Sequence, residues 1–113
     1  MFNLEAKFQQ MFIAIYRFEI KEEKKDQFIQ GWKGLTDLIY QYEGSLGSRL
    51  HKKSPTVYIA YAQWPDEKTF TNSGAKMPEE ADRFRSMMKE ACTQITTEHT
   101  MEVVEDLLRA QKH

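Results

Sequence analysis

The chain has 113 residues, a length that suits one domain with a single modest hydrophobic core. Charged residues make up 29% of the chain and nearly cancel, at a formal net charge of −1, which argues against the basic stripe of a nucleic-acid-binding protein. No apolar run approaches the roughly 20 residues of a membrane span, and residues 1–10 lack the apolar core of a signal peptide. We therefore expect a cytoplasmic protein that binds neither nucleic acid nor membrane, and its single cysteine, Cys92, fits a reducing compartment.

Met11 opens the first segment with a clear structural pattern. We expect residues 1–10 to form an N-terminal arm, residues 11–108 to form the domain, and residues 109–113 to form a C-terminal tail. No function is assigned to the arm.

The first two elements are a strand and a helix. Residues 11–20 are apolar, aromatic and β-branched with good alternation, which predicts a strand. Residues 21–42 predict an amphipathic helix, which we expect to end at Gly44. Two glycines inside this helix each cost about 1 kcal/mol relative to alanine, and a close approach of the helix to a sheet would explain them. The apolar stripe and the two glycines are Phe28, Trp32, Leu35, Ile39 and Tyr42, and Gly31 and Gly34.

The rest of the chain continues with two strands, a short helix, a longer helix and a last strand. Residues 45–53 and 56–64 predict two strands joined by a turn at Ser54 and Pro55, and Pro65 suits the first position of a short helix. A longer helix opens at Pro78, and a strand is expected in the first part of residues 96–108. The apolar stripe of that longer helix is Ala81, Phe84, Met88, Ala91 and Ile95, with Cys92 continuing it as a small core residue.

The element order β-α-β-β-α-β, with one short extra helix, predicts an α+β ferredoxin-like fold. Its four-stranded antiparallel sheet carries both main helices on one face. The other face is also apolar, since residues 56–64 place Val57, Ile59, Tyr61 and Gln63 on one side and Tyr58, Ala60, Ala62 and Trp64 on the other. A water-exposed sheet face of this kind predicts a homodimer through the open sheet face, closing a barrel that holds a cavity.

Three segments carry a resemblance to a known family. They are the strand at residues 11–20, the glycine-bounded YEGSLGSRLHKK, and YIAYAQWPDEKTF, in which a strand ends on tryptophan before an acidic helix start and a buried aromatic residue. Over residues 11–108 the sequence resembles the antibiotic biosynthesis monooxygenase (ABM) domain family of the dimeric α+β barrel superfamily. The resemblance implies the dimeric barrel, and its members include cofactor-free oxygenases of quinols and aromatic polyketides and haem-degrading enzymes.

The resemblance also implies a pocket. Trp64 matches the tryptophan that lines the pocket of several oxygenase members, where an asparagine often accompanies it; here Tyr16 and Ala60 stand at the two positions where that asparagine occurs. The haem-degrading members have an axial histidine in the helix after the tryptophan, and residues 78–92 contain none. The expected substrate pocket consists of Trp64, Tyr16, Tyr58, Phe70 and Arg83.

Other polar residues allow chemistry at such a pocket. His51 and His99 are candidate catalytic bases for a phenol proton, because an unperturbed histidine titrates near neutral pH, although a lone strand histidine is more often a surface residue. Arg49, Arg83 and Arg85 could hold an oxyanion, or could simply face solvent. The spacing of the histidines and Cys92 fits no metal site, and no flavin or nicotinamide fingerprint is present.

These observations predict a monooxygenase that needs no cofactor. Its partners would be a phenolic or quinol-type aromatic substrate and O₂, with the pocket supplying orientation and exclusion of water. The alternative is a non-catalytic protein of the same fold that holds a small hydrophobic ligand or serves in a stress response. A third candidate, a haem-binding protein, would need a histidine from outside residues 78–92.

Overall fold

The structure is a computed structural model that describes residues 11–109. The expected arm of residues 1–10 and residues 110–113 of the expected tail lie outside the described residues. In chain order the elements are β1 (Phe12–Ile20), η1 (Glu22–Lys24), α2 (Lys25–Glu43), β2 (Gly47–Ser54), β3 (Val57–Trp64), α3 (Glu67–Thr71), α4 (Ala81–Ala91) and β4 (Cys92–Glu102).

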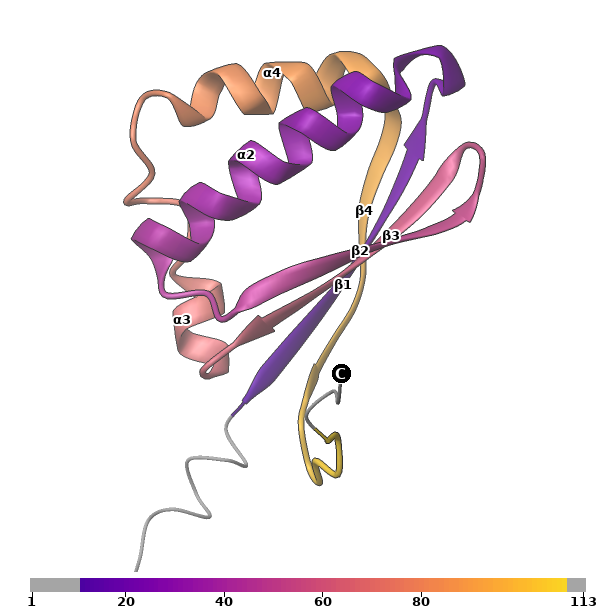
Figure 1. The fold of residues 1–113 in the computed structure, drawn as a ribbon. Helices are drawn as coiled ribbons and strands as arrows, with labels where there is room; N and C mark the ends of the chain where they lie inside the picture. The colour runs from indigo at the N-terminus through magenta and orange to yellow at the C-terminus, as the bar shows by residue number, and fades with distance from the viewer. Residues whose placement is uncertain (1–10, 110–113) are drawn as a thin grey trace, which may run out of the picture.

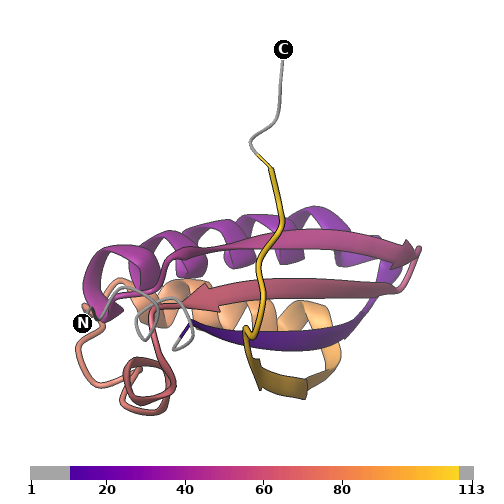
Figure 2. The same cartoon turned by 90° about the horizontal axis from the view of Figure 1, so that it is seen from below.

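The four strands form one antiparallel sheet in the order β2-β3-β1-β4. Helices α2 and α4 both lie on one face of this sheet, as Figures 1 and 2 show from two sides. The α+β ferredoxin-like fold expected from the element order is therefore confirmed. No helix within residues 11–109 is long and apolar enough to cross a lipid bilayer.

The strand register sorts the side chains into two faces. Paired residues on neighbouring antiparallel strands point to the same side of a sheet, and successive residues point to opposite sides. Tyr16 pairs with Ala60 on the helix-covered face, whereas Ile15 pairs with both Tyr61 and His99 on the other, which we call the open face. The core lies on the helix-covered face, where Phe28 of α2 is fully buried.

The two helix glycines allow α2 and α4 to approach each other. A Cβ on Gly31 would lie 2.9 Å from Met88 Cγ, and a Cβ on Gly34 would overlap the ring of Phe84. The expected close approach to a sheet is thus corrected: the neighbour is a helix. α2 has its main tertiary contact with α4 rather than with the strands.

The helix ends differ slightly from the sequence-based expectations. Gly44 ends α2 in the left-handed region at φ 81°, as expected of a glycine after a helix. The short helix α3 begins after Asp66, whose carboxylate accepts a hydrogen bond from Thr69 N at 2.7 Å, so Asp66 and not Pro65 sets its start. Helix α4 begins at Ala81, after a turn in which Ala81 N donates to Pro78 O at 3.0 Å.

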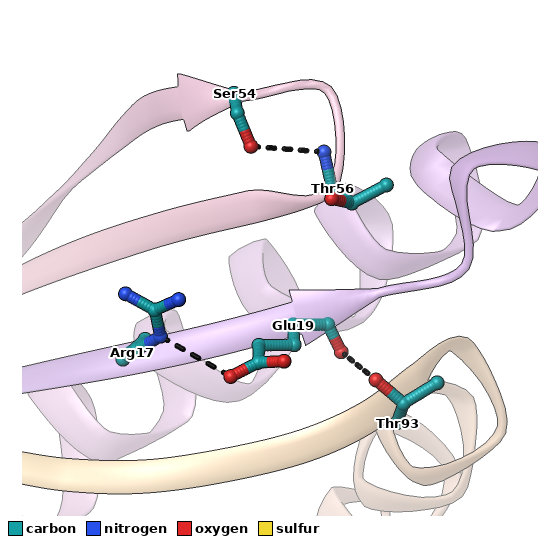
Figure 3. Close-up of polar contacts among 5 residues, drawn as sticks. All are labelled: Arg17, Glu19, Ser54, Thr56 and Thr93. Atoms are coloured by element: carbon teal, nitrogen blue, oxygen red, sulfur yellow. Dashed lines mark hydrogen bonds and ion pairs between the residues drawn. The ribbon is translucent and has the colours of Figure 1, made fainter.

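The end of α4 corrects one expectation. The spacing of apolar residues predicts that Cys92 and Ile95 continue the helix, but β4 starts at Cys92, which pairs with Ile20 of β1. Thr93 Oγ1 donates a hydrogen bond to Glu19 O at 3.1 Å, which links the start of β4 to β1 (Figure 3). Pairing with a central strand, together with the β-branched residues that follow Cys92, outweighs the helical spacing of the apolar residues.

Figure 3 also shows two contacts nearby. Arg17 Nε lies 3.2 Å from Glu19 Oε2 in an ion pair on the open face. At the turn between β2 and β3, Thr56 N donates to Ser54 Oγ at 3.4 Å. The turn expected at Ser54 and Pro55 is therefore present.

Candidate functional site

A cavity of about 620 Å³ lies between the helix-covered face of the sheet and the two main helices. Its volume falls within the range of about 300–1,000 Å³ that is typical of small-molecule sites. Most of its wall is apolar and comes from β1, β3 and α2, and polar side chains of α4 line one side. The lining residues used below are Tyr16, Trp32, Thr36, Ser48, Ala62 and Trp64, with Asp82, Arg85, Ser86 and Lys89 on α4.

The two alanines of β3 have different roles. Ala60 is 1% exposed and packs in the main core, where the ring of Phe28 lies 5.3 Å from that of Tyr58. Ala62 lines the cavity instead. A methyl side chain at position 62 therefore leaves room beside Trp64, whereas the room beside Ala60 is filled by protein.

Trp64 closes one end of the cavity as the last residue of β3. Its ring meets that of Phe70 edge-on at a centroid distance of 5.6 Å, and Phe70 in turn lies 5.4 Å from Phe12. The helix start at Asp66 brings Phe70 back against Trp64, and the hydrogen bond from Thr69 lowers the pKa of the Asp66 carboxyl.

The indole N–H of Trp64 is a buried donor without an acceptor. Trp64 is 3% exposed, and its Nε1 finds no hydrogen-bond partner among the described residues. An unsatisfied buried donor costs roughly 1–3 kcal/mol, so native proteins seldom keep one without a reason. The indole ring that carries this donor also lines the cavity.

Tyr16 adds a hydroxyl to the same cavity from the middle of β1. Burial raises the pKa of this phenol above its usual value of 10.0 because the charged form is poorly solvated there. Tyr16 is therefore a neutral hydrogen-bond donor at physiological pH rather than a base.

Helix α4 provides the polar side of the cavity, which sequence reasoning largely missed. Arg85 Nη1 lies 3.2 Å from Asp82 Oδ1 in an exposed ion pair, and Ser86 and Lys89 lie further along the same helix. Residues 82, 85, 86 and 89 repeat at spacings of three and four, which would have placed them on one helical face. The sequence does not tell whether such a face meets solvent or a cavity.

The structure brings only part of the expected pocket together. Tyr16 and Trp64 both line the cavity. Tyr58 is 4% exposed in the main core, and Phe70 lies behind Trp64. Arg83 is exposed and its guanidinium lies 4.6 Å from the ring centre of Phe84, while Arg85 reaches the cavity instead.

The structure does not bring either histidine to the cavity. His51 pairs with Ile59 and His99 pairs with Ile15, so both belong to the open face, and both are exposed. His51 Nδ1 lies 3.1 Å from Ile59 O. The physical reason is the two-residue period of a strand, which sends these positions away from the side that holds Tyr16 and Trp64. Among the described residues, no three His, Cys, Asp or Glu side chains gather into a group that could hold a metal ion.

Comparison with solved structures shows the same fold in several proteins of low sequence identity. SnoaB, a cofactor-independent oxygenase from Streptomyces nogalater, matches with a TM-score of 0.68 at 13% identity, over 88% of this chain and 99% of SnoaB. A Caulobacter crescentus protein described as a candidate antibiotic biosynthesis monooxygenase matches with a TM-score of 0.68 at 16% identity, over 88% and 95% of the two chains. A conserved Bacteroides thetaiotaomicron protein of unknown function, named a possible oxidoreductase, matches with a TM-score of 0.67 at 13% identity, over 84% and 99%.

The sequence comparisons give a family but no close relative. No curated protein matches the chain. The family model described as "Antibiotic biosynthesis monooxygenase" matches residues 11–75, which is more than half of the chain and includes the strand that ends on Trp64. The chain therefore belongs to the antibiotic biosynthesis monooxygenase family.

Proposed function

We propose that this protein is a cofactor-independent monooxygenase that acts on a phenolic or quinol-type aromatic molecule. The observation that carries the proposal is the unsatisfied indole N–H of Trp64 at the end of an apolar cavity of about 620 Å³. Membership of the monooxygenase family supports the reaction type. The cavity supports the substrate class, since a flat ring fits its aromatic wall and a ring oxygen would accept from Trp64.

In the proposed mechanism, two neutral donors stabilise the charge that develops on the substrate. Trp64 Nε1–H and Tyr16 O–H donate to the ring oxygen, which favours the phenolate over the phenol in an apolar surrounding. The phenolate passes one electron to O₂, and the resulting radicals join at a ring carbon. The peroxide formed there takes up the proton that the phenol released, and the hydroperoxide then loses water together with the hydrogen of that ring carbon. One oxygen atom of O₂ becomes a quinone carbonyl and the other leaves as water, so the ring C–H and O–H are oxidised and O₂ is reduced.

Neither histidine that the sequence offers as a base lies at the cavity. His51 and His99 are the base candidates from the sequence, but both lie on the open face. Proton loss at the polar side of the cavity, to Asp82 or to water there, fits the arrangement better. We therefore expect His51→Ala to retain oxygenase activity.

Oxygen uptake with hydroquinone and anthrone, without added cofactor, tests the proposal. Wild-type protein should consume O₂ faster than autoxidation, and Trp64→Phe, which keeps a ring but removes the N–H, should lower the rate about tenfold, the effect of one lost hydrogen bond of roughly 1.4 kcal/mol. His51→Ala is the matched control and should behave as wild type. No uptake above autoxidation with either compound would refute the oxygenase.

The second candidate function is a non-catalytic carrier of a small hydrophobic molecule. It is favoured by the lack of the asparagine that often accompanies the tryptophan in the oxygenases that the sequence resembles, since Tyr16 and Ala60 stand at its two positions. Anaerobic and aerobic incubations separate the two functions. A carrier would return the ligand unchanged in air, whereas an oxygenase would return a quinone in air and unchanged ligand under nitrogen.

We also propose that the protein is a homodimer and acts in the cytoplasm. Ile15, Ile59 and Tyr61 of the open face have no helix over them, and an apolar sheet face is most simply covered by the same face of a second copy. The single cysteine fits a reducing compartment.

A further inference from the structure

We propose that the ligand carries a linear apolar substituent that leaves the cavity between α2 and β2 and lies in a surface groove between Trp32 and Tyr40. This inference rests on the proposed function and deepens it, because it turns a simple phenol or quinol into one that bears a chain. The groove has a volume of about 530 Å³, and its walls come from α2 and from the start of β2.

The groove adjoins the cavity. Trp32, Thr36 and Ser48 line both hollows, so the two meet at these three side chains. Thr36 and Ser48 are small, and Ser48 Oγ already donates to Tyr61 O at 3.0 Å, which keeps its hydroxyl on the strand. Two of the three side chains at which the cavity and the groove meet are therefore small.

Glycine leaves the start of β2 without a side chain beside the groove. Gly47, the first residue of β2, also lines the groove, and only its backbone can do so. A substituent that passes Thr36 and Ser48 thus meets the backbone of the sheet edge rather than a further side chain.

Two aromatic side chains flank the opening. Trp32 and Tyr40 stand four residues before and after Thr36, which places each about 6 Å along the helix axis from it and on nearly the same face. Tyr40 is 57% exposed, and no side chain of the main core packs over it. A chain that emerges at Thr36 would run along one or both of these rings.

The charges at the groove favour an apolar substituent over an ionic one. Asp37 lies at the rim, and its carboxylate accepts a hydrogen bond from Gln41 Nε2 at 2.8 Å. Lys33 is an exposed cation at the same rim. One positive and one negative group give no net charge to attract an ion, whereas Trp32, Tyr40 and the glycines offer apolar surface.

Calorimetric titration with resorcinol and 4-hexylresorcinol tests the inference on the whole chain. Wild-type protein should bind 4-hexylresorcinol at least tenfold more tightly than resorcinol. Tyr40→Ala should weaken 4-hexylresorcinol binding about three- to tenfold and leave resorcinol binding unchanged. Tyr42→Ala removes a second exposed tyrosine of α2 that does not line the groove, and should change the affinity for neither ligand.

A second variant, Tyr40→Glu, places a charge in the groove at a residue that does not line the cavity. It should remove the advantage of the hexyl chain, because the apolar chain would cover a carboxylate, and it should leave resorcinol binding unchanged. If Tyr40→Ala and Tyr40→Glu leave the advantage of the chain intact, or weaken both ligands equally, the proposed groove site is refuted. Resorcinol binding that Trp64→Phe weakens, with no gain from the chain, would overturn the groove and keep the proposed function. Binding of neither compound would overturn both.

Discussion

Burial acts differently on the polar side chains of this protein. Trp64 keeps an N–H that cannot ionise, so burial leaves it an unsatisfied donor. Tyr16 can ionise, and burial raises its pKa, which keeps it neutral and able to donate. In the proposed mechanism both groups donate to a ligand oxygen, and neither is a base. The residues at the cavity wall thus support stabilisation of a phenolate more than its formation.

Cys92 allows a test of burial at the scale of one residue. Desolvation raises the pKa of its thiol from 9.0 to about 11. At pH 8 we expect iodoacetamide to alkylate the folded protein on the order of 100-fold more slowly than the urea-unfolded chain. The reason is that, at a fixed pH below the pKa, the fraction of thiolate falls tenfold for each unit by which the pKa of the thiol is higher. Equal alkylation rates in the two states would contradict the raised pKa.

The same shift predicts a pH dependence of stability. A raised folded pKa means that the folded state favours the neutral thiol, so this contribution is fully present below pH 9.0 and is lost as the pH rises toward 11. Cys92→Ala should remove this part of the alkaline destabilisation and should leave the pH dependence of stability near pH 7 unchanged, as urea denaturation at a series of pH values would measure.

At the scale of elements, the close contact of α2 with α4 determines where the helices stand above the sheet. Phe84 and Met88 of α4 lie where a side chain on Gly34 or Gly31 would otherwise be. The helices therefore pack first on each other, and the space that remains between them and β1 and β3 is the cavity. The apolar stripes of α2 and α4 therefore form part of the core and also part of the cavity wall.

We expect Gly34→Ala to lower the free energy of unfolding by about 1–3 kcal/mol, although alanine is the better helix former, because its methyl group would overlap the Phe84 ring. Urea denaturation followed by circular dichroism measures this change. In a Phe84→Ala background the ring is gone, so Gly34→Ala should there be neutral or stabilising. A Gly34→Ala variant as stable as the wild type would show that α4 shifts freely, contrary to this account.

At the scale of the whole molecule, the sheet has one covered face and one open face (Figure 2). The open face carries apolar residues, among them Ile15 and Tyr61. It also carries the cations Arg17 and Arg49 and the two exposed histidines. Arg17 is paired with Glu19, and Arg49 lies 5.7 Å from the ring centre of Tyr61. An isologous interface through this face would bury the apolar centre and leave the charged groups at its rim.

Light scattering coupled to gel filtration tests the homodimer. Ile15→Glu puts a charge in the centre of the open face and should convert a dimer into a monomer at micromolar concentration, because a buried unpaired carboxylate is strongly unfavourable. Tyr42→Glu, at an exposed position near the end of α2, is the matched control and should remain dimeric. A monomeric wild-type protein would refute the homodimer and with it the need for a covered sheet face.

The local pattern was sufficient for much of this protein. Alternation in residues 11–20 and 56–64, the stripe from Phe28 to Tyr42 and the glycine at position 44 gave the element order and with it the α+β fold. The tryptophan at the end of the third predicted strand, before an acidic helix start, also indicated the family and one end of the cavity. These features depend on residues close together in the chain, which is why a single sequence reveals them.

Only the tertiary structure decided which neighbour each face meets. The end of α4 at Ala91, the packing of Gly34 on a helix rather than on a sheet, and the place of the two histidines on the open face all depend on pairing between distant segments. The same holds for Arg85, which lines the cavity, and Arg83, which does not. A periodic pattern tells which residues share a face, but the partner that covers the face is selected by the long-range packing of the whole sheet and both helices.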